Sequence, residues 1–260
     1  MSIHELREKP HWSYSALQCY LTCPMKYKFR YVDNAPMERT CSALPFGRAF
    51  HAVLSERALK GPDFKLEDAQ ENFAFFFKGE TDVSENLRYK PNETFESLLN
   101  TGFDMLTVAL ENWQDDYAVE SVAESFSVSL PGLSRPLIGE FDCVVSGAET
   151  TIVDWKTASS KWPQGKADRD LQASAFCYAY KQVHGKNPVF RFDVITKTKQ
   201  PSVNSHYTLR TQDELDRFEF IAGRIEKAVN AELFYPNENI INCAECPYAD
   251  RCKKSTWKGD

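Results

Sequence analysis

Three polar residues interrupt two segments that otherwise have the character of buried strands. Asp142 lies inside PLIGEFDCVVSG, and Asp154 and Lys156 close the apolar run of ETTIVDWKT. If the two segments pair as a hairpin, two carboxylates and an ammonium meet at one edge of a sheet.

Carboxylate oxygens bind hard cations such as Mg²⁺ or Mn²⁺, and a bound metal activates water and neutralises charge on a phosphate. A nearby lysine can orient that water or stabilise the transition state. An Asp-x-Lys spacing is common on solvated strand ends, but here it interrupts core-forming sequence, which favours metal-dependent phosphodiester hydrolysis.

The cysteines form a second group with chemical potential. Of eight cysteines, Cys243, Cys246 and Cys252 lie close together in the tail with the spacing C-x2-C-x5-C. The cytosol keeps thiols reduced, so in an intracellular chain we do not expect a disulfide framework. Three thiolates can share one metal centre, but zinc sites and cubane clusters usually have four ligands, so a fourth must come from elsewhere. We expect three other cysteines to serve packing or loops: Cys41, Cys143 and Cys177.

The elements that must position these residues are mainly helical in the first part of the chain. Ser13 can cap a helix over YSALQCYLTCPMKYKFRYV, which Pro24 must kink or divide. Pro45 suits the first turn of a helix over FGRAFHAVLSERAL. Two further helical patterns cover 66–77 and 93–117.

From Ala118 the sequence alternates apolar and polar residues, as half-buried strands do. VAESFSVSL, PLIGEFDCVVSG and ETTIVDWKT indicate three strands, and a Gly-containing turn would make the last two a hairpin. A helix at 168–184, a strand at 190–198, a strand NSHYTLR and a helix at 212–231 follow. This order predicts an α/β domain with a mixed sheet flanked by helices.

Four segments, GRAFHAVLSE, GEFDCVV, TIVDWKTA and LQASAFCYAY, follow one another in the order of a known set of motifs. They resemble the motifs of RecB-like PD-(D/E)XK nucleases, the group that includes AddB-type and CRISPR-adaptation nucleases. The resemblance covers nearly the whole chain. It implies a restriction-endonuclease-like α/β fold, in which a mixed central sheet is flanked by helices, with a helical N-terminal part and a Cys-rich, cluster-binding tail.

The resemblance also implies roles for individual residues. His51 on the early helix, together with Asp142 and Asp154, would bind Mg²⁺ or Mn²⁺. The carbonyl of Trp155 would be a further metal ligand, and Lys156 would be the catalytic lysine. Without these companions, a helix histidine is more often satisfied by a backbone or carboxylate partner.

The motif on the following helix matches only in part. Gln172 corresponds to a glutamine that assists the chemistry in relatives, and we assign it that role. Relatives tend to carry tyrosine four residues later, where this chain has Phe176, so the role of that tyrosine is not assigned. Asp154 stands where many relatives carry glutamate, which the family name allows.

A subset of these nucleases holds a [4Fe–4S] cluster through one cysteine near the N-terminus and three near the C-terminus. Cys23, in LTCPMKYKFRY, matches the first position, and Cys243, Cys246 and Cys252 match the others. The cluster would tie the two ends of the chain together in a structural role, because hydrolysis requires no electron transfer. Cys19, four residues before Cys23 on the same expected helix face, is the competing fourth ligand, and Zn²⁺ is the alternative to an iron–sulfur cluster.

We expect residues 1–260 to form a single nuclease domain. Within it, residues 1–117 would be the mainly helical part that carries Cys23 and His51. Residues 118–210 would form the nuclease sheet core, and residues 211–260 the C-terminal helix and the Cys-rich tail.

The expected substrate is single-stranded DNA, cut by an exonuclease or an end-processing enzyme. The net charge of −6 counts against a surface that wraps nucleic acid throughout, so local basic patches must bind the phosphates. Lys161, Trp162 and Lys166 follow the Asp-x-Lys motif closely and are placed to touch the scissile strand. A second group mixes aromatic and basic residues, which suits single strands, although we expect at least half of its aromatics to belong to a helical core. That group comprises Trp12, Tyr14, Tyr20, Lys26, Tyr27, Lys28, Phe29, Arg30 and Tyr31.

Two other classes of function compete with this hypothesis. A non-catalytic nucleic-acid-binding or assembly protein could keep the fold with a structural zinc or Fe–S site, but the complete set of His, Asp, Asp and Lys argues against it. A hydrolase with a cysteine nucleophile is weaker, because no cysteine lies beside a histidine and an acid in a recognisable motif.

The remaining features concern location and partners. No apolar run is long enough to span a bilayer and the N-terminus lacks the apolar core of a signal peptide, so we expect a cytoplasmic protein without membrane contact. We also expect it to be encoded by a bacterium or a phage. The motif G-x-x-x-x-G-K-[ST] does not occur, so coupled unwinding would need a helicase or recombination partner.

Overall fold

Six strands form a mixed central sheet in the computed structural model, which describes residues 1–255. They are β1 (Trp12–Ser13), β4 (Ala118–Val128), β5 (Leu137–Ser146), β6 (Thr151–Ala158), β7 (Val189–Thr196) and β8 (Val203–Thr208). A separate parallel pair joins β2 (Thr40–Cys41) to β3 (Leu87–Arg88). The end of the predicted tail, residues 256–260, lies outside the described residues.

Strand β5 pairs with β4 along one edge, whereas β1 and β6 pair with separate parts of its other edge. β4 runs antiparallel along the first edge, from Ala118 opposite Ser146 to Val128 opposite Leu137. On the other edge, β1 lies parallel to residues 137–138, whereas β6 lies antiparallel to residues 143–145. Among the described residues, 139–142 have no strand partner on this second edge, and we call this interval the β5 gap. β7 continues the sheet parallel to β6, and β8 follows antiparallel.

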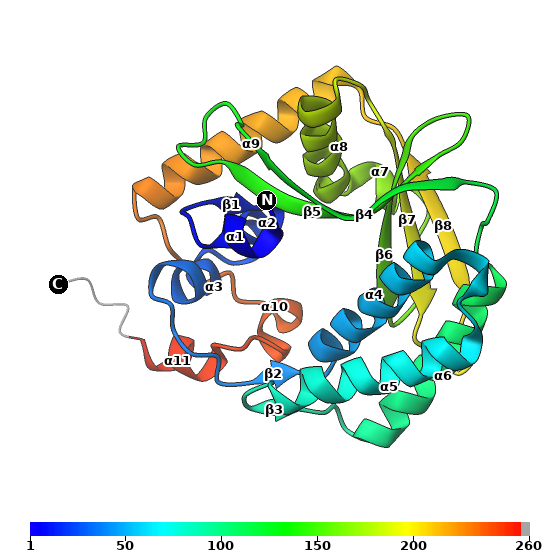
Figure 1. Cartoon of the computed structure of the whole chain (residues 1–260). Coiled ribbons are helices and arrows are strands. Elements are labelled where there is room, and N and C mark those ends of the chain that lie inside the picture. Colours follow the sequence, from blue (N-terminus) through cyan, green and yellow to red (C-terminus); the bar gives the residue numbers. More distant parts are fainter. Residues whose placement is uncertain (256–260) are drawn as a thin grey trace.

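Helices cover both faces of the sheet (Figure 1). The first face carries α2 (Tyr14–Thr22), α8 (Leu171–His184) and α9 (Gln212–Asn230), and the second carries α4 (Ala43–Lys60), α5 (Leu66–Asp82) and α6 (Phe95–Glu111). Because side chains alternate along a strand, Ile152 of β6 joins the core on the first face, whereas Val153 and Trp155 join the core on the second. Asp154 and Lys156 alternate with Val153 and Trp155, so they point toward the first face.

Local sequence explains how the N-terminal helices begin and end. Ser13 caps α2, since its side chain accepts a hydrogen bond from the backbone N–H of Ala16. Pro24 opens α3 (Pro24–Tyr27), and Cys23 between the two helices has extended backbone angles, as a residue before proline prefers. The chain then continues as a π-helical turn at Lys28–Val32. The predicted division at Pro24 is confirmed, but Cys19 and Cys23 do not share a helix face as predicted.

The two ends of the described chain lie against each other. The backbone N–H of Met25 donates to the carbonyl of Tyr235 at 3.0 Å, and the Asn237 side chain donates to the carbonyl of Thr22 at 2.9 Å. The short elements of the chain are α1 (Ile3–Arg7), a 3₁₀ turn (Gly61–Asp63), α7 (Lys166–Arg169), α10 (Ile240–Ala244) and α11 (Ala249–Lys254). In Figure 1, α10 and α11 lie close to α3. Within the described part of the chain, no helix has the length and apolar character required to cross a bilayer.

The predicted α/β class, the mixed sheet and the β5–β6 hairpin are confirmed. The helix predicted over 93–117 is too long, because α6 ends at Glu111. After Glu111, two side-chain contacts join the chain to other elements. Arg57 donates to Asp115 at 2.8 Å, and Arg191 donates to Gln114 at 2.7 Å.

Candidate active site

The two aspartates lie where β5 and β6 separate. The ladder between these strands ends at the pair Cys143 and Val153, and the next pair in that register would be Asp142 with Asp154. The backbone N–H of Trp155, freed from the ladder, instead donates to the Asp142 carboxylate at 3.1 Å. The separation of the strands therefore leaves room for two carboxylates on neighbouring strands, as the sequence predicts.

Asp142 contacts the histidine of α4. The Nδ1 atom of His51 lies 3.3 Å from Oδ2 of Asp142. Burial alone would raise the pKa of the Asp142 carboxyl, but its hydrogen bond with His51 and the charges around it hold the pKa below the ordinary value. Burial likewise opposes protonation of His51, whereas Asp142 raises its pKa above the ordinary value.

Asp154 is the most deeply buried member of the group, with 4% of its side chain exposed. Its Oδ1 accepts a hydrogen bond of 2.5 Å from the Gln172 side chain. The ammonium of Lys156 lies 2.6 Å from its Oδ2, yet this oxygen receives no hydrogen bond of good geometry within the described residues. Burial raises the pKa of Asp154 to about 6, against the attraction of Lys156.

The charges explain why both members of this ion pair have raised pKa values. Burial opposes the charge on Lys156, but Asp154 and Asp142 together outweigh it and raise the lysine pKa. For Asp154, burial raises the pKa more than the attraction of the Lys156 ammonium lowers it, and the negative charge of Asp142 raises it further. Two carboxylates thus lie beside one lysine and one histidine, and when His51 is neutral the site has an excess of negative charge that a cation can neutralise.

The donor set fits a hard divalent metal. Two carboxylates and an imidazole converge, and Oδ2 of Asp154 is a buried oxygen with an unused lone pair. In residues 1–255, no three His, Cys, Asp or Glu side chains are already closed around a position for one ion. At the candidate site, His51 and Lys156 are each paired with a carboxylate. Both pairs would have to loosen to admit the metal.

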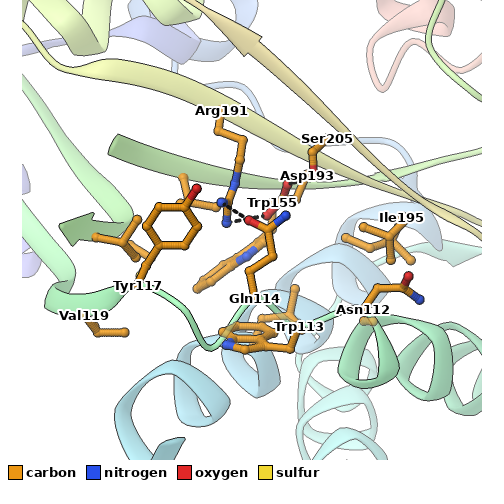
Figure 2. Close-up of a pocket in the computed structure, with 16 residues that line it drawn as sticks. Asn112, Trp113, Gln114, Tyr117, Val119, Trp155, Arg191, Asp193, Ile195 and Ser205 are labelled. Atoms are coloured by element: carbon orange, nitrogen blue, oxygen red, sulfur yellow. Dashed lines mark hydrogen bonds and ion pairs between the residues drawn. The ribbon is translucent and has the colours of Figure 1, made fainter. Parts of the chain in front are cut away.

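The side chain of Trp155 supports the site from the opposite face of β6. Its ring meets the His51 ring edge-on at 6.3 Å and lies 6.0 Å from the ring of Trp113. Arg57 stacks over Trp113 at 5.0 Å. Figure 2 shows these tryptophans in the wall of a cavity of about 40 Å³, beside Arg191 and its partner Gln114. The backbone N–H of Trp155 donates to Asp142, so the backbone of this residue lies beside the site for which the family resemblance implies its carbonyl as a ligand.

Helix α8 brings Gln172 to Asp154 through its first turn. Asp170 caps this helix, because its side chain accepts from the backbone N–H of Gln172 at 2.9 Å. Phe176, one turn further, points into the core against Phe126 and Phe141 and has no access to the site. Asp170 is not among the residues predicted for the site, although an Asp directly before a helix is a recognisable N-cap signal.

The structure brings the four predicted cluster cysteines to one place. Cys23, Cys243, Cys246 and Cys252 line a single cavity of about 720 Å³. Burial and the neighbouring thiols raise the pKa of Cys252. Cys19 is buried in the core of the first face and does not line this cavity, so the geometry favours Cys23 over its competitor.

The predicted nucleic-acid contacts divide into core and surface groups. Four of the six aromatics near the N-terminus are buried, as expected for a helical core: Trp12, Tyr20, Tyr27 and Phe29. In the loop after β6, Trp162 packs on Phe192 at 5.0 Å, and Lys166 stacks on Trp162 at 3.8 Å. Lys161 is exposed.

Comparison with known proteins supports the interpretation of these elements. Residues 11–253 match the PD-(D/E)XK nuclease superfamily. Among solved structures, the chain is similar to a presumed exonuclease from Eubacterium rectale, with 13% identity, a TM-score of 0.59, and coverage of 96% of this chain and 90% of that chain. That likeness concerns the fold. The chain is also similar to SSO0001, with 10% identity, a TM-score of 0.41, and coverage of 90% of this chain and 96% of that chain. No curated protein matches the sequence. The match over residues 11–253 shows that this chain belongs to the PD-(D/E)XK nuclease superfamily.

Proposed function

We propose that this chain is a metal-dependent deoxyribonuclease that acts on single strands as an exonuclease or end-processing enzyme. The observation that carries the proposal is the convergence of His51, Asp142, Asp154, Lys156 and Gln172 where β5 and β6 separate. These residues come from four elements of the fold, α4, β5, β6 and α8, and a chance cluster of polar side chains would not combine a metal donor set with a buried lysine. We also propose that residues 1–260 form a single nuclease domain.

The residues divide the work between holding a cation and handling the phosphate. His51, Asp142 and Asp154 would hold Mg²⁺ or Mn²⁺, with the Trp155 carbonyl as a further ligand. The metal would activate water and neutralise charge on the phosphate. Gln172 fixes Oδ1 of Asp154 and thereby leaves Oδ2 directed at the site. Lys156 would exchange its carboxylate partner for the attacking water or the charged phosphate oxygens.

The test is cleavage of labelled DNA by the wild type, Asp154→Ala and Lys156→Ala in Mg²⁺ or Mn²⁺. Lys78→Ala is a matched control, because Lys78 is exposed and pairs with Asp82 on the same helix. We expect the control to match the wild type and both site variants to be inactive. Equal degradation by all four proteins would refute the assignment and favour a non-catalytic nucleic-acid-binding role.

Two substrate comparisons address the finer part of the proposal. After β6, Lys166 at the start of α7 supplies a cation over the half-buried ring of Trp162, and a cation beside an aromatic side chain is a combination that suits single strands. We expect single-stranded DNA to be cut faster than the duplex and linear strands faster than circles. Efficient cutting of circular single strands would show an endonuclease instead.

We further propose that Cys23, Cys243, Cys246 and Cys252 bind a [4Fe–4S] cluster with a structural role. Their shared cavity supports this. Zinc held by the same four thiolates is the alternative, since both kinds of site take four cysteine ligands.

Metal analysis of anaerobically purified protein tests the cluster. We expect a brown protein that contains iron and sulfide, and we expect Cys23→Ser to lose them. Cys19→Ser is the matched control and should retain both. A colourless protein with stoichiometric zinc would refute the iron–sulfur assignment.

A further inference from the structure

Tyr14 enters the active-site region at the β5 gap. The strand β1 pairs with β5 only through Trp12 and Ser13, which lie opposite residues 137–138. The chain then leaves the sheet at Tyr14, the first residue of α2, where the gap begins. The same gap ends at Asp142, beside β6. The topology thus places a tyrosine and an active-site aspartate along the same unpaired stretch of β5.

The Tyr14 hydroxyl lies against the N-terminus of α8 but is poorly satisfied there. Its described acceptors are Oε1 of Gln18 at 3.2 Å and Oδ1 of Asp170 at 3.4 Å. Both distances exceed the usual O–H···O length of about 2.7–2.8 Å. Oδ1 of Asp170 also accepts the shorter bond from the backbone of Gln172, at 2.9 Å. The one hydroxyl proton is therefore shared between two long contacts and is available to a better acceptor.

The surrounding charges keep this phenol protonated. Burial, followed by the negative charges of Asp170 and Asp154, raises the pKa of Tyr14. The hydroxyl is joined to the proposed metal site through Asp170, which accepts from the backbone of Gln172, whose side chain donates to Asp154. The hydroxyl consequently remains a hydrogen-bond donor at every pH at which the protein would work, and a phosphate oxygen is a strong, charged acceptor.

We propose that Tyr14 is a substrate-binding residue whose hydroxyl donates a hydrogen bond to a phosphate oxygen of the bound strand. Asp170 would orient the phenol in the free protein and release it when the phosphate arrives. The hydroxyl would thereby reach the site from the N-terminal helix α2. Helix α8 supplies no hydroxyl of its own at Phe176, whose ring lies in the core. This inference rests on the proposed nuclease function, since it assumes that a phosphodiester lies beside Asp154.

The experiment compares the wild type with Tyr14→Phe, which keeps the ring and removes only the hydroxyl. Tyr178→Phe is the control, because it removes a phenol that donates to the backbone of Ser129 at 3.2 Å. The readouts are kcat and KM on a labelled single strand in Mn²⁺, Mn²⁺ affinity by calorimetry, and affinity for the strand in Ca²⁺. For Tyr14→Phe we expect strand affinity to fall roughly two- to tenfold. We expect kcat to fall about 100-fold, because the hydrogen bond strengthens as negative charge develops on the phosphate oxygen in the transition state. The Mn²⁺ affinity of this variant should be unchanged, and Tyr178→Phe should match the wild type in all three readouts.

The outcomes separate this inference from the function on which it rests. Wild-type kcat and strand affinity in Tyr14→Phe would overturn the role of Tyr14 while leaving the nuclease assignment intact. A wild type that binds the strand without cutting it would overturn the nuclease assignment, and strand affinity alone would then decide the role of Tyr14. A changed Mn²⁺ affinity in Tyr14→Phe would show that the hydroxyl supports the metal site instead of the phosphate, which would also overturn the inference.

Discussion

Replacing Asp154 with asparagine should stabilise the metal-free protein while abolishing its activity. Burial raises the pKa of Asp154 to about 6, compared with 3.8 for an ordinary aspartate. One pKa unit corresponds to about 1.36 kcal/mol, so this difference in pKa means that ionisation of Asp154 destabilises the folded state by about 3 kcal/mol. Asparagine carries no charge, and its oxygen can still accept the hydrogen bond from Gln172.

The sign of the pH dependence follows from the raised pKa. Below about pH 4, the carboxyl is protonated in both the folded and the unfolded protein. As the pH rises, the unfolded chain loses its proton first, so the folded state loses stability until Asp154 itself ionises at about 6. Asp154→Asn should therefore match the wild type below about pH 4 and exceed its free energy of unfolding by about 3 kcal/mol near neutral pH.

Urea denaturation in EDTA, followed by circular dichroism across this pH range, measures the difference. Asp82→Asn serves as the control, because Asp82 pairs with Lys78 on an exposed helix surface and should change stability little. Mn²⁺ should then stabilise the wild type, in which it binds the folded state, and leave Asp154→Asn unaffected. Equal or lower stability of Asp154→Asn near neutral pH would refute the argument that Asp154 is held at a cost for metal binding.

Two further predictions concern the metal and the helical layer. Mn²⁺ affinity should fall below about pH 6, because Asp154 must lose its proton to bind a cation; calorimetry on either side of that pH measures it, and a constant affinity would argue against Asp154 as a ligand. Gly102→Ala should destabilise the protein by about 1–3 kcal/mol, because its Cβ would lie 2.0 Å from the ring of Phe73. Gly79→Ala, whose Cβ would meet nothing within 4 Å, is the control in urea denaturation, and equal effects of the two substitutions would contradict the packing argument.

The sequence predicts the centre of the candidate site because its residues are conspicuous. Asp142, Asp154 and Lys156 place charges in segments whose other residues build the core, and only a buried function or a strained fold accounts for that. The hairpin then follows from a short turn between two strands. His51 and Gln172 carry no comparable local signal, and their assignment depended on the resemblance to a family.

Other parts of the site depend on contacts that no local pattern encodes. Tyr14 reaches Asp170 across 156 positions of sequence, and its position depends on β1, a strand of two residues that is too short to show an alternating pattern. The choice between Cys19 and Cys23 was accessible in principle. Proline disfavours helical backbone angles in the residue before it, so Pro24 turns Cys23 out of the helix that holds Cys19.

The contact between the two chain ends has a consequence for folding in the cell. The segment around Met25 finds its partners at Tyr235 and Tyr248, more than 200 residues later. Closing so long a loop is slow and entropically costly. During synthesis, the apolar surface of the N-terminal helices should therefore stay uncovered until Tyr235 and Tyr248 have emerged from the ribosome. A chain that stops before the cysteine-containing tail would leave that surface open to chaperones or to aggregation.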